Sequence, residues 1–238
     1  MDCTRNEFCK QLPPESREKL CANCRRRFFK AQSIQMRYDY LQNCMMLLDG
    51  CLTTSLDLGA SNLDHDNEIP ALYMGFPGRL LNLDITFGFE DLQDSLEYAE
   101  YYYLTDTWVA SFSHHIIRKL CDTDSDFRHA VLRNMTLVET DCCQMMALFR
   151  PGYTYYGVRH LTEMLANNKV YLTQQQLAQL MSRDRTSISK AVARLKSEHP
   201  DLWEAYVNNK GRELTRPMPG ASARCSSTEE TAGPSAVS

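Results

Sequence analysis

The sequence has no apolar stretch long enough to span a membrane, which takes about 20 residues in a helix. Its first ten residues, MDCTRNEFCK, lack the basic segment followed by an apolar segment that marks a secretory signal. We therefore expect a cytoplasmic protein that has no membrane partner.

Positive charge is not in excess, because the 238 residues carry a net charge of −4. A general binder of polyanions needs an overall basic surface, so any affinity for nucleic acid must be local to one segment. Hydrophobic residues make up 43% of the chain and charged residues 24%, which is the balance of a globular protein, and the length leaves room for two domains.

The sequence also lacks the residue patterns of common catalytic sites. It contains no recognisable pair of nucleophile and base, no glycine-rich loop for phosphate and no His-Glu metal motif. Four acidic residues lie close together in an apparent loop and are interpreted as a solvated tip: Asp57, Asp64, Asp66 and Glu68. We therefore predict that the protein is not an enzyme.

Ten cysteines without a secretory signal indicate free thiols in a reducing compartment. Four of them have the spacing C-x5-C-x11-C-x2-C near the N-terminus: Cys3, Cys9, Cys21 and Cys24. Thiolates bind iron–sulfur clusters and zinc, so a metal site remains the alternative to free thiols.

The most informative stretch runs from Tyr171 to Lys196 and predicts two short helices joined by a tight turn. Thr173 precedes the first helix and Gln176 follows three residues later, which is the arrangement of a capping box. Asp184 is placed to cap the second helix. Three apolar residues recur there at the spacing of one buried face: Ile188, Val192 and Leu195.

The opposite face of the second helix carries hydroxyls and cations, the groups that bond to base edges and phosphates. Five cations and one carboxylate lie between residues 173 and 196, so this stretch is basic in an acidic chain. We interpret it as a DNA-binding helix-turn-helix; an ordinary hairpin of helices with a solvated basic face is the alternative. The residues expected to contact DNA are Thr173, Arg183, Arg185, Thr186, Ser187, Ser189, Lys190 and Lys196.

The segments beyond this stretch complete the predicted DNA-binding domain. Residues 202–207 and 212–214 read as two strands joined by a glycine-containing turn at 208–211, which would form a wing. The Pro-, Gly- and Ser-rich residues 216–238 read as a disordered tail. A winged helix-turn-helix domain is therefore expected at residues 151–215.

The N-terminal half alternates between helical and β-rich patterns. Pro13, Pro14 and Glu15 are expected to open a short helix that ends near Cys24. The run of three arginines that follows is placed at the helix end, facing the negative end of its dipole; a nucleic-acid or membrane patch is the alternative. Short apolar pieces broken by turn residues predict a β-rich domain from about residue 34 to 109. His114 and His115 are expected to start a surface helix.

A helix is predicted from Asp126 to Phe149. Its apolar residues are separated alternately by four and three positions, the spacing of a seam that pairs with a second copy of the helix: Val131, Met135, Val138, Cys142, Met145 and Phe149. Packing of this seam against the chain's own domain is the alternative. Pro151 and Gly152 then interrupt the helix and predict a hinge before a further helix at 155–165.

This order of elements resembles the Crp/Fnr superfamily of bacterial transcription regulators, over about residues 8–214. The resemblance is strongest at residues 172–195, where Arg185 occupies the position of the family's base-reading arginine. Ser182 replaces the usual turn glycine, Thr186 stands where many members carry glutamate, and Lys190 stands where they carry a second arginine. Residues 110–120 resemble the stretch that leaves the family's β-roll.

The resemblance implies an α+β fold in three parts: a cyclic-nucleotide-binding-like β-roll that senses an effector at 1–125, a dimerisation helix at 126–150, and the winged helix-turn-helix. It also implies a homodimer that binds double-stranded DNA at a near-palindromic site, and contact with RNA polymerase if the protein is an activator. Arg185 would then read guanine through two hydrogen bonds.

The effector expected from the resemblance is a small organic molecule. Family members that bind cyclic nucleotides use a Gly-Glu pair and an Arg-Ser or Arg-Thr pair; alignment places Asn82-Leu83 and Glu97-Tyr98 there, so cyclic AMP is not expected. Aromatic residues suit an organic ligand, although they equally suit a core: Phe87, Tyr98, Tyr101 and Tyr103. A redox or oxygen sensor with a cysteine-bound iron–sulfur cluster is the alternative, and a dimeric adaptor that does not bind DNA is the alternative of another class.

Overall fold

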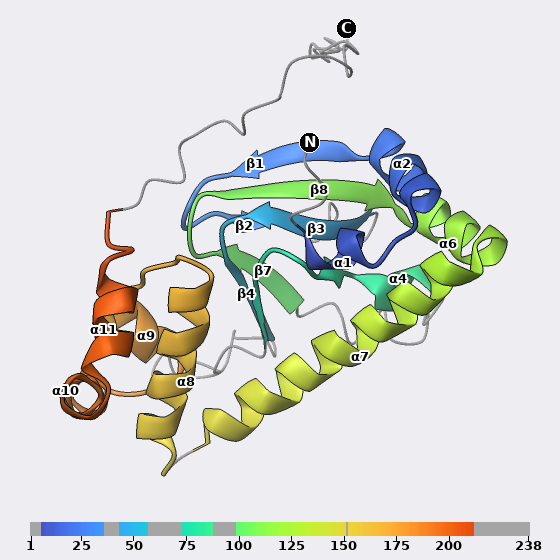
Figure 1. The fold of residues 1–238 in the computed structure, drawn as a ribbon. Coiled ribbons are helices and arrows are strands. Elements are labelled where there is room, and N and C mark those ends of the chain that lie inside the picture. The colour runs from blue at the N-terminus through green and yellow to red at the C-terminus, as the bar shows by residue number, and fades with distance from the viewer. Residues whose placement is uncertain (1–5, 36–42, 57–72, 88–98, 151, 212–238) are drawn as a thin grey trace, which may run out of the picture.

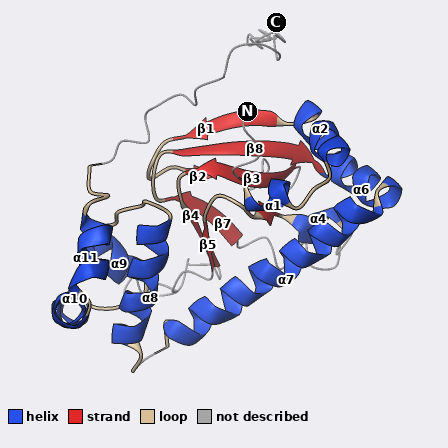
Figure 2. Ribbon diagram, in the orientation of Figure 1, coloured by secondary structure: helices blue, strands red, loops and turns tan. Residues whose placement is uncertain are grey.

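The computed structural model describes residues 6–35, 43–56, 73–87, 99–150 and 152–211, and it has an α+β fold (Figure 1). Two antiparallel sheets form the N-terminal part, and the long helix α7 (Ser125–Leu148) runs along them (Figure 2). A separate group of helices lies at its far end: α8 (Thr154–Asn167), α9 (Gln174–Leu180), α10 (Arg185–Glu198) and α11 (Pro200–Val207). None of the described helices combines the length and the apolar composition of a membrane span.

The first sheet has the strand order β1-β8-β3-β6. Its strands are β1 (Arg25–Phe29), β8 (Thr107–Ser113), β3 (Asn43–Asp49) and β6 (Leu80–Leu81). The second sheet has the order β2-β7-β4-β5. Its strands are β2 (Ile34–Gln35), β7 (Ala99–Tyr103), β4 (Leu52–Leu56) and β5 (Tyr73–Gly75). The predicted β-rich region is therefore confirmed for the residues that the structure describes.

Gly50 makes the tight connection between β3 and β4 possible. Its φ is +96°, and a Cβ there would lie 2.4 Å from the hydroxyl oxygen of Thr107 on the neighbouring strand. Only a residue without a side chain fits this left-handed conformation beside another strand.

Apolar side chains from both sheets fill the space between them. The buried members of this cluster are Met45, Leu47, Leu52, Tyr73, Leu81, Tyr101, Tyr103 and Val109. The ring of Phe29 stacks on that of Tyr103, with 4.3 Å between the ring centroids. Large hydrophobic residues thus fill the interior of the described β-roll.

Short helices cover the outer face of the first sheet. They are α1 (Glu7–Lys10), α2 (Pro14–Ala22), α4 (Leu83–Thr86) and α6 (His114–Thr123). Ser113 caps α6 by accepting a hydrogen bond from the amide of Ile116, so the predicted helix start at His114 is confirmed. The aromatic rings of Phe8 from α1 and Phe127 from α7 meet edge to face in the cluster beneath these helices.

The three arginines after α2 correct one prediction. Helix α2 ends at Ala22, and Arg25, Arg26 and Arg27 belong to strand β1, which pairs with β8 at the edge of the first sheet. They therefore do not lie at the helix end. The strand forms because Phe28 and Phe29 continue the run and pair with Trp108 and Thr107 of β8.

Helix α7 (Ser125–Leu148) is fixed to the β-roll by polar contacts. The side-chain amide of Asn134, which is buried, donates to the carbonyl of Leu80 at 2.7 Å and accepts from the Leu80 amide at 3.0 Å. Further along the helix, Arg79 Nε lies 3.1 Å from Asp141 Oδ2. The Asn134 side chain therefore makes with Leu80 of β6 the same pair of hydrogen bonds that the backbone of a neighbouring strand would make.

The apolar seam of α7 faces the chain's own domains. Val131 and Met135 pack in the cluster beneath the short helices, Val138 and Cys142 against the β-roll interior, and Met145 and Phe149 among helices α8 to α11. Packing within the chain, the alternative considered for this seam, accounts for its buried members Val131, Met145 and Phe149. Met135, Val138 and Cys142 are half-buried, and pairing of the seam with a second copy stays a prediction. Val131 is completely buried and is therefore not available to a partner helix.

Candidate nucleic-acid interface

Helices α9 (Gln174–Leu180) and α10 (Arg185–Glu198) are joined by a tight turn, at the residues for which the sequence predicts a helix-turn-helix. The capping box predicted at the start of α9 is present: the Gln176 amide donates to Thr173 Oγ1 at 3.2 Å, and the Thr173 amide donates to Gln176 Oε1 at 2.8 Å. The side chain of Thr173 is thus engaged in starting this helix, although the residue is exposed.

The turn between the two helices is held by backbone hydrogen bonds. The Ser182 amide donates to the Gln179 carbonyl at 3.0 Å, and the Arg183 amide donates to the Ala178 carbonyl at 2.9 Å. Ser182 has a φ of 45°, which is the left-handed conformation that usually calls for glycine. The turn therefore closes with a serine where a glycine is expected.

Asp184 caps helix α10 as predicted. Its carboxylate accepts hydrogen bonds from the Ser187 amide at 2.8 Å and from the Ser187 hydroxyl at 2.6 Å. These hydrogen bonds hold the pKa of the Asp184 carboxyl below its usual value. The negative charge also lies at the positive end of the helix dipole, so it stabilises the helix start.

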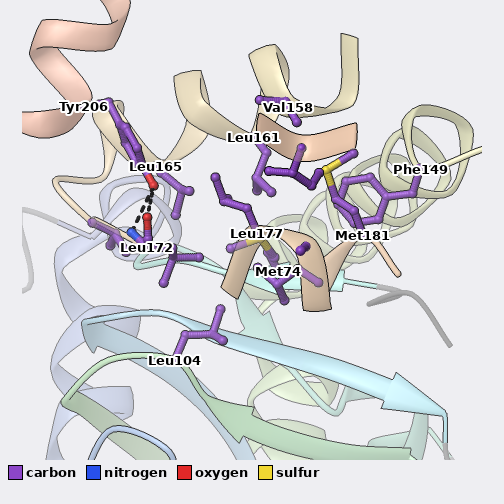
Figure 3. Close-up of a cluster of buried hydrophobic side chains, with 14 of the residues drawn as sticks. Met74, Leu104, Phe149, Val158, Leu161, Leu165, Leu172, Leu177, Met181 and Tyr206 are labelled. Atoms are coloured by element: carbon purple, nitrogen blue, oxygen red, sulfur yellow. Dashed lines mark hydrogen bonds between the residues drawn. The ribbon is translucent and has the colours of Figure 1, made fainter. Parts of the chain in front are cut away.

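The inner face of α10 is buried against helices α8 (Thr154–Asn167), α9 and α11 (Pro200–Val207). The residues predicted for this face, Ile188, Val192 and Leu195, have at most 1% of their surface exposed. Figure 3 shows the cluster that α10 joins, with Leu161 and Leu165 from α8 and Leu177 from α9. The orientation of α10 is thereby fixed by its apolar side.

Three aromatic residues support this helical group, and sequence reasoning assigned no such role to them. The hydroxyl of buried Tyr206 donates to the Leu172 carbonyl and accepts from the Leu172 amide at 3.1 Å (Figure 3). Lys196 Nζ lies 4.7 Å from the centroid of the Trp203 ring, and the Arg194 guanidinium lies 3.9 Å from that of Tyr155. For Trp203 and Tyr206 the signal would have been their separation by three residues, which places both on one side of a helix.

The predicted wing is wrong at its first strand. Residues 202–207 belong to α11, which Pro200 opens as the first helical residue. Trp203 and Tyr206, three residues apart, both turn toward the group, so the apolar period is that of a helix and not of a strand. A turn follows at 208–211, as expected, and the second predicted strand, 212–214, lies outside the described residues.

The predicted DNA-contacting residues divide into two sets. Arg185, Thr186 and Lys190 are exposed at the first turns of α10, and within the described chain neither Arg185 nor Lys190 forms an ion pair. The others have partners inside the protein. Ser187 caps the helix, and Ser189 Oγ donates to Gln174 Oε1 of α9 at 3.0 Å.

Arg183 also has a partner inside the protein. Its guanidinium donates to the Phe149 carbonyl at the end of α7 at 2.5 Å and to the Ser182 carbonyl at 3.0 Å. Sequence reasoning did not foresee this contact, because residues 149 and 183 lie far apart in the chain.

Of the aromatic residues considered for an effector pocket, the structure describes Phe87, Tyr101 and Tyr103. Tyr101 and Tyr103 are buried in the β-roll interior; the Tyr101 hydroxyl donates to Asn82 Oδ1, and the Tyr103 hydroxyl lies 4.0 Å from Met45 Sδ. Phe87 is 39% exposed, and Tyr98 lies outside the described residues. Asn82 and Leu83, at the position of the cyclic-nucleotide motif, are buried too.

A pocket of about 500 Å³ lies elsewhere, between the α1–α2 connection and the first half of α7. Its lining mixes apolar and charged groups: Gln11, Leu12, Pro13, Asp126, His129, Ala130 and Arg133. This size is within the range of sites for small ligands.

The N-terminal cysteines do not assemble a metal site among the residues that the structure describes. No three His, Cys, Asp or Glu side chains within the described ranges are close enough to share an ion. Cys9 is buried, Cys21 and Cys24 are half-buried, and Cys3 lies outside these ranges.

No protein-family model and no curated protein sequence matches the chain. Solved structures of transcription regulators match its fold. TTHB099, a regulator of the CRP family from Thermus thermophilus, is 16% identical with a TM-score of 0.54, over 79% of this chain and 98% of that one. The c-di-GMP responsive global regulator CLP of Xanthomonas campestris is 12% identical with a TM-score of 0.56, over 78% and 93%. CprK complexed with OCPA is 15% identical with a TM-score of 0.50, over 79% and 85%.

Proposed function

We propose that this chain, which has a Crp/Fnr-like fold, is a sequence-specific DNA-binding transcription regulator. The observation that carries the proposal is the exposure of Arg185, Thr186 and Lys190 at the start of α10, with Thr186 and Lys190 on the side opposite the buried face and Arg185 at its edge. Two cations and a hydroxyl at the start of such a helix can reach base edges and phosphates in a major groove.

The chain acts as a homodimer at a near-palindromic site. Each subunit presents one α10, and two such helices in successive major grooves read two half-sites about one helical turn apart. A near-palindromic site is the expected counterpart of twofold symmetry in the protein.

The experiment begins with selection of binding sites from random duplexes and measurement of affinity by fluorescence anisotropy. Arg185→Ala is then compared with the wild type on the selected site. We expect a loss of about 1–3 kcal/mol per half-site and a relaxed preference at one base pair, because the arginine pairs with one guanine.

Arg194→Ala is the matched control on the same helix. Its guanidinium is paired with Glu198 Oε1 at 2.7 Å and covers Tyr155, so its removal should leave the sequence preference intact. An unchanged preference in Arg185→Ala would refute the role of Arg185. A flat titration of the wild type at low salt would favour the dimeric adaptor.

A small organic effector of the N-terminal part regulates this activity in our proposal, and cyclic AMP does not. The pocket beside α7 supports this, because its ligand would contact Asp126, His129 and Arg133 of the helix that leads to the DNA-binding part. Compounds can be screened for an effect on DNA affinity, with Arg133→Ala as the variant expected to lose the response. A response that Arg133→Ala retains would place the effector elsewhere.

A further inference from the structure

The start of the recognition helix is tied directly to the end of α7. Arg183 immediately precedes Asp184, the cap of α10, and its guanidinium bonds to the carbonyl of Phe149, the residue that caps α7. A cation at the C-terminal end of a helix faces the negative end of the helix dipole. The contact thus joins two helix ends that are 34 residues apart in the chain.

A second contact supports the same junction. Met181 of the turn is completely buried, and it lies against Gly157 of α8, where a Cβ would be 2.6 Å from Met181 Cε and 2.8 Å from the Leu148 carbonyl oxygen. Helix α8 can approach the last turn of α7 so closely only because residue 157 has no side chain. Phe149 and Met181 lie side by side in this cluster (Figure 3).

We propose that Arg183 is a positioning residue for DNA recognition: by bonding to the end of α7 it fixes the placement of the reading end of α10. Arg183 precedes Arg185 by two positions, so a movement of the last turn of α7 would displace Arg185 and the residues beside it that contact bases. The inference rests on the proposed DNA-binding function. It assigns Arg183 a role other than the direct DNA contact expected from the sequence.

Two kinds of measurement distinguish a positioning role from a phosphate contact. A phosphate contact contributes about one unit per subunit to the slope of log affinity against log salt, whereas a positioning residue contributes none. In a dimer, a residue that fixes helix placement also sets the tolerated spacing between half-sites. The assay therefore compares the selected site with sites lengthened or shortened by one base pair, at several salt concentrations.

For Arg183→Ala we expect affinity for the selected site to fall about tenfold or more, the salt slope to stay as in the wild type, and discrimination between spacings to weaken. Arg183→Lys should behave like Arg183→Ala in spacing, because one ammonium group cannot replace both guanidinium contacts. Gly157→Ala should weaken spacing discrimination as well, since it separates the turn from α7. Lys190→Ala is the control: its salt slope should fall and its spacing preference should persist.

Arg183 would instead be a phosphate contact if Arg183→Ala lowered the salt slope as Lys190→Ala does and kept the discrimination between spacings. In that case Arg183→Lys should restore the affinity for DNA. Wild-type behaviour of Arg183→Ala in both assays would also overturn the proposal. Hydrogen exchange of the DNA-free protein tests the junction independently. Arg183→Ala should accelerate amide exchange in the last turn of α7 and leave exchange in α2 unchanged. Exchange in the last turn of α7 at the wild-type rate would refute the junction. If the wild type binds no DNA, the proposed function fails while this last result still decides whether the junction exists.

Discussion

Ser182 combines two unfavourable features in the turn of the helix-turn-helix. Its φ of 45° is strained for a residue with a side chain, and its hydroxyl oxygen is buried with no hydrogen-bond partner in the described part of the chain. Ser182→Gly should raise the free energy of unfolding by about 1 kcal/mol, after allowance for the greater freedom of glycine in the unfolded chain. Urea denaturation with an unchanged m-value is the measurement.

Ser182→Ala is the informative comparison for this substitution. It removes the hydroxyl but keeps a Cβ in the left-handed conformation, so it should recover only part of the gain. Equal stabilities of the glycine and alanine variants would show that backbone strain at residue 182 is negligible.

The cap of α10 makes part of the stability dependent on pH. Hydrogen bonds from Ser187 lower the pKa of Asp184 in the folded protein. A carboxyl whose folded-state pKa is depressed stabilises the fold fully above its unfolded-state pKa, about 4, and loses that stabilisation as pH falls through the lower folded-state value. The free energy of unfolding of the wild type should therefore exceed that of Asp184→Asn by less at pH 3 than at pH 7.

Asparagine is the suitable replacement because it also caps helices but carries no charge. Other carboxyls with lowered pKa values, such as Asp124, titrate in both proteins and cancel in the difference between them. A difference in unfolding free energy that is the same at both pH values would contradict the assignment to Asp184.

At the scale of elements, α7 has a second stripe that the described chain leaves exposed. Leu132 is 55% exposed and Met146 is 48% exposed, and they are two heptads apart with Cys143 exposed between them. This stripe lies roughly a quarter of a turn from the buried seam, given 3.6 residues per turn. We therefore expect the dimer contact along Leu132, Cys143 and Met146.

The variant Leu132→Glu/Met146→Glu should sediment as a monomer, because it places charges in the expected contact while removing no buried side chain. Gln144→Glu adds a charge on an exposed position away from the stripe and should remain dimeric. If the double glutamate variant still sedimented as a dimer, the subunit contact would lie on another surface.

Local sequence signals predicted some elements well and misassigned others for physical reasons. The capping box at Thr173 and the cap at Asp184 involve residues within one helical turn, and both are present. The seam of α7 was visible as a period, but a period does not say whether the buried face meets the same chain or another. Residues 202–207 and the arginines of β1 were short segments whose structure depends on distant partners, Leu172 and strand β8.

At the scale of the whole molecule, one apolar cluster joins the β-roll to the group of helices α8 to α11. Met74, Phe76 and Leu104 from the N-terminal part are buried together with Leu177 and other residues of helices α8 to α11 (Figure 3). Parts that share a core unfold together when separating them would expose it. The two parts should therefore unfold in one transition.

The two tryptophans allow this to be measured, since Trp108 lies in β8 and Trp203 in α11. Trp203→Phe leaves a reporter of the β-roll, and Trp108→Phe leaves a reporter of the helical part. Each variant's fluorescence transition in urea should coincide with its own far-ultraviolet circular dichroism transition. Separate transitions within either variant would show that the shared cluster does not couple the parts.

The sequence predicts where a DNA-contacting surface would lie, but it does not show how the residues of that surface are connected inside the protein. The basic face of α10 follows from the spacing of Arg185, Thr186 and Lys190 alone. The role of Arg183 at Phe149 depends on tertiary packing, which the sequence pattern does not encode. The core role considered for the aromatic residues holds for Tyr101 and Tyr103.

The aromatic residues behind α10 have a thermodynamic consequence. Tyr155, Trp203 and Tyr206 hold the helix in place in the DNA-free protein, so no helix of this group has to fold when the duplex arrives. Binding that includes folding produces a large negative heat-capacity change from newly buried apolar surface. The heat-capacity change of this protein on binding DNA should accordingly be small. The enthalpy and the entropy of binding should therefore change little with temperature.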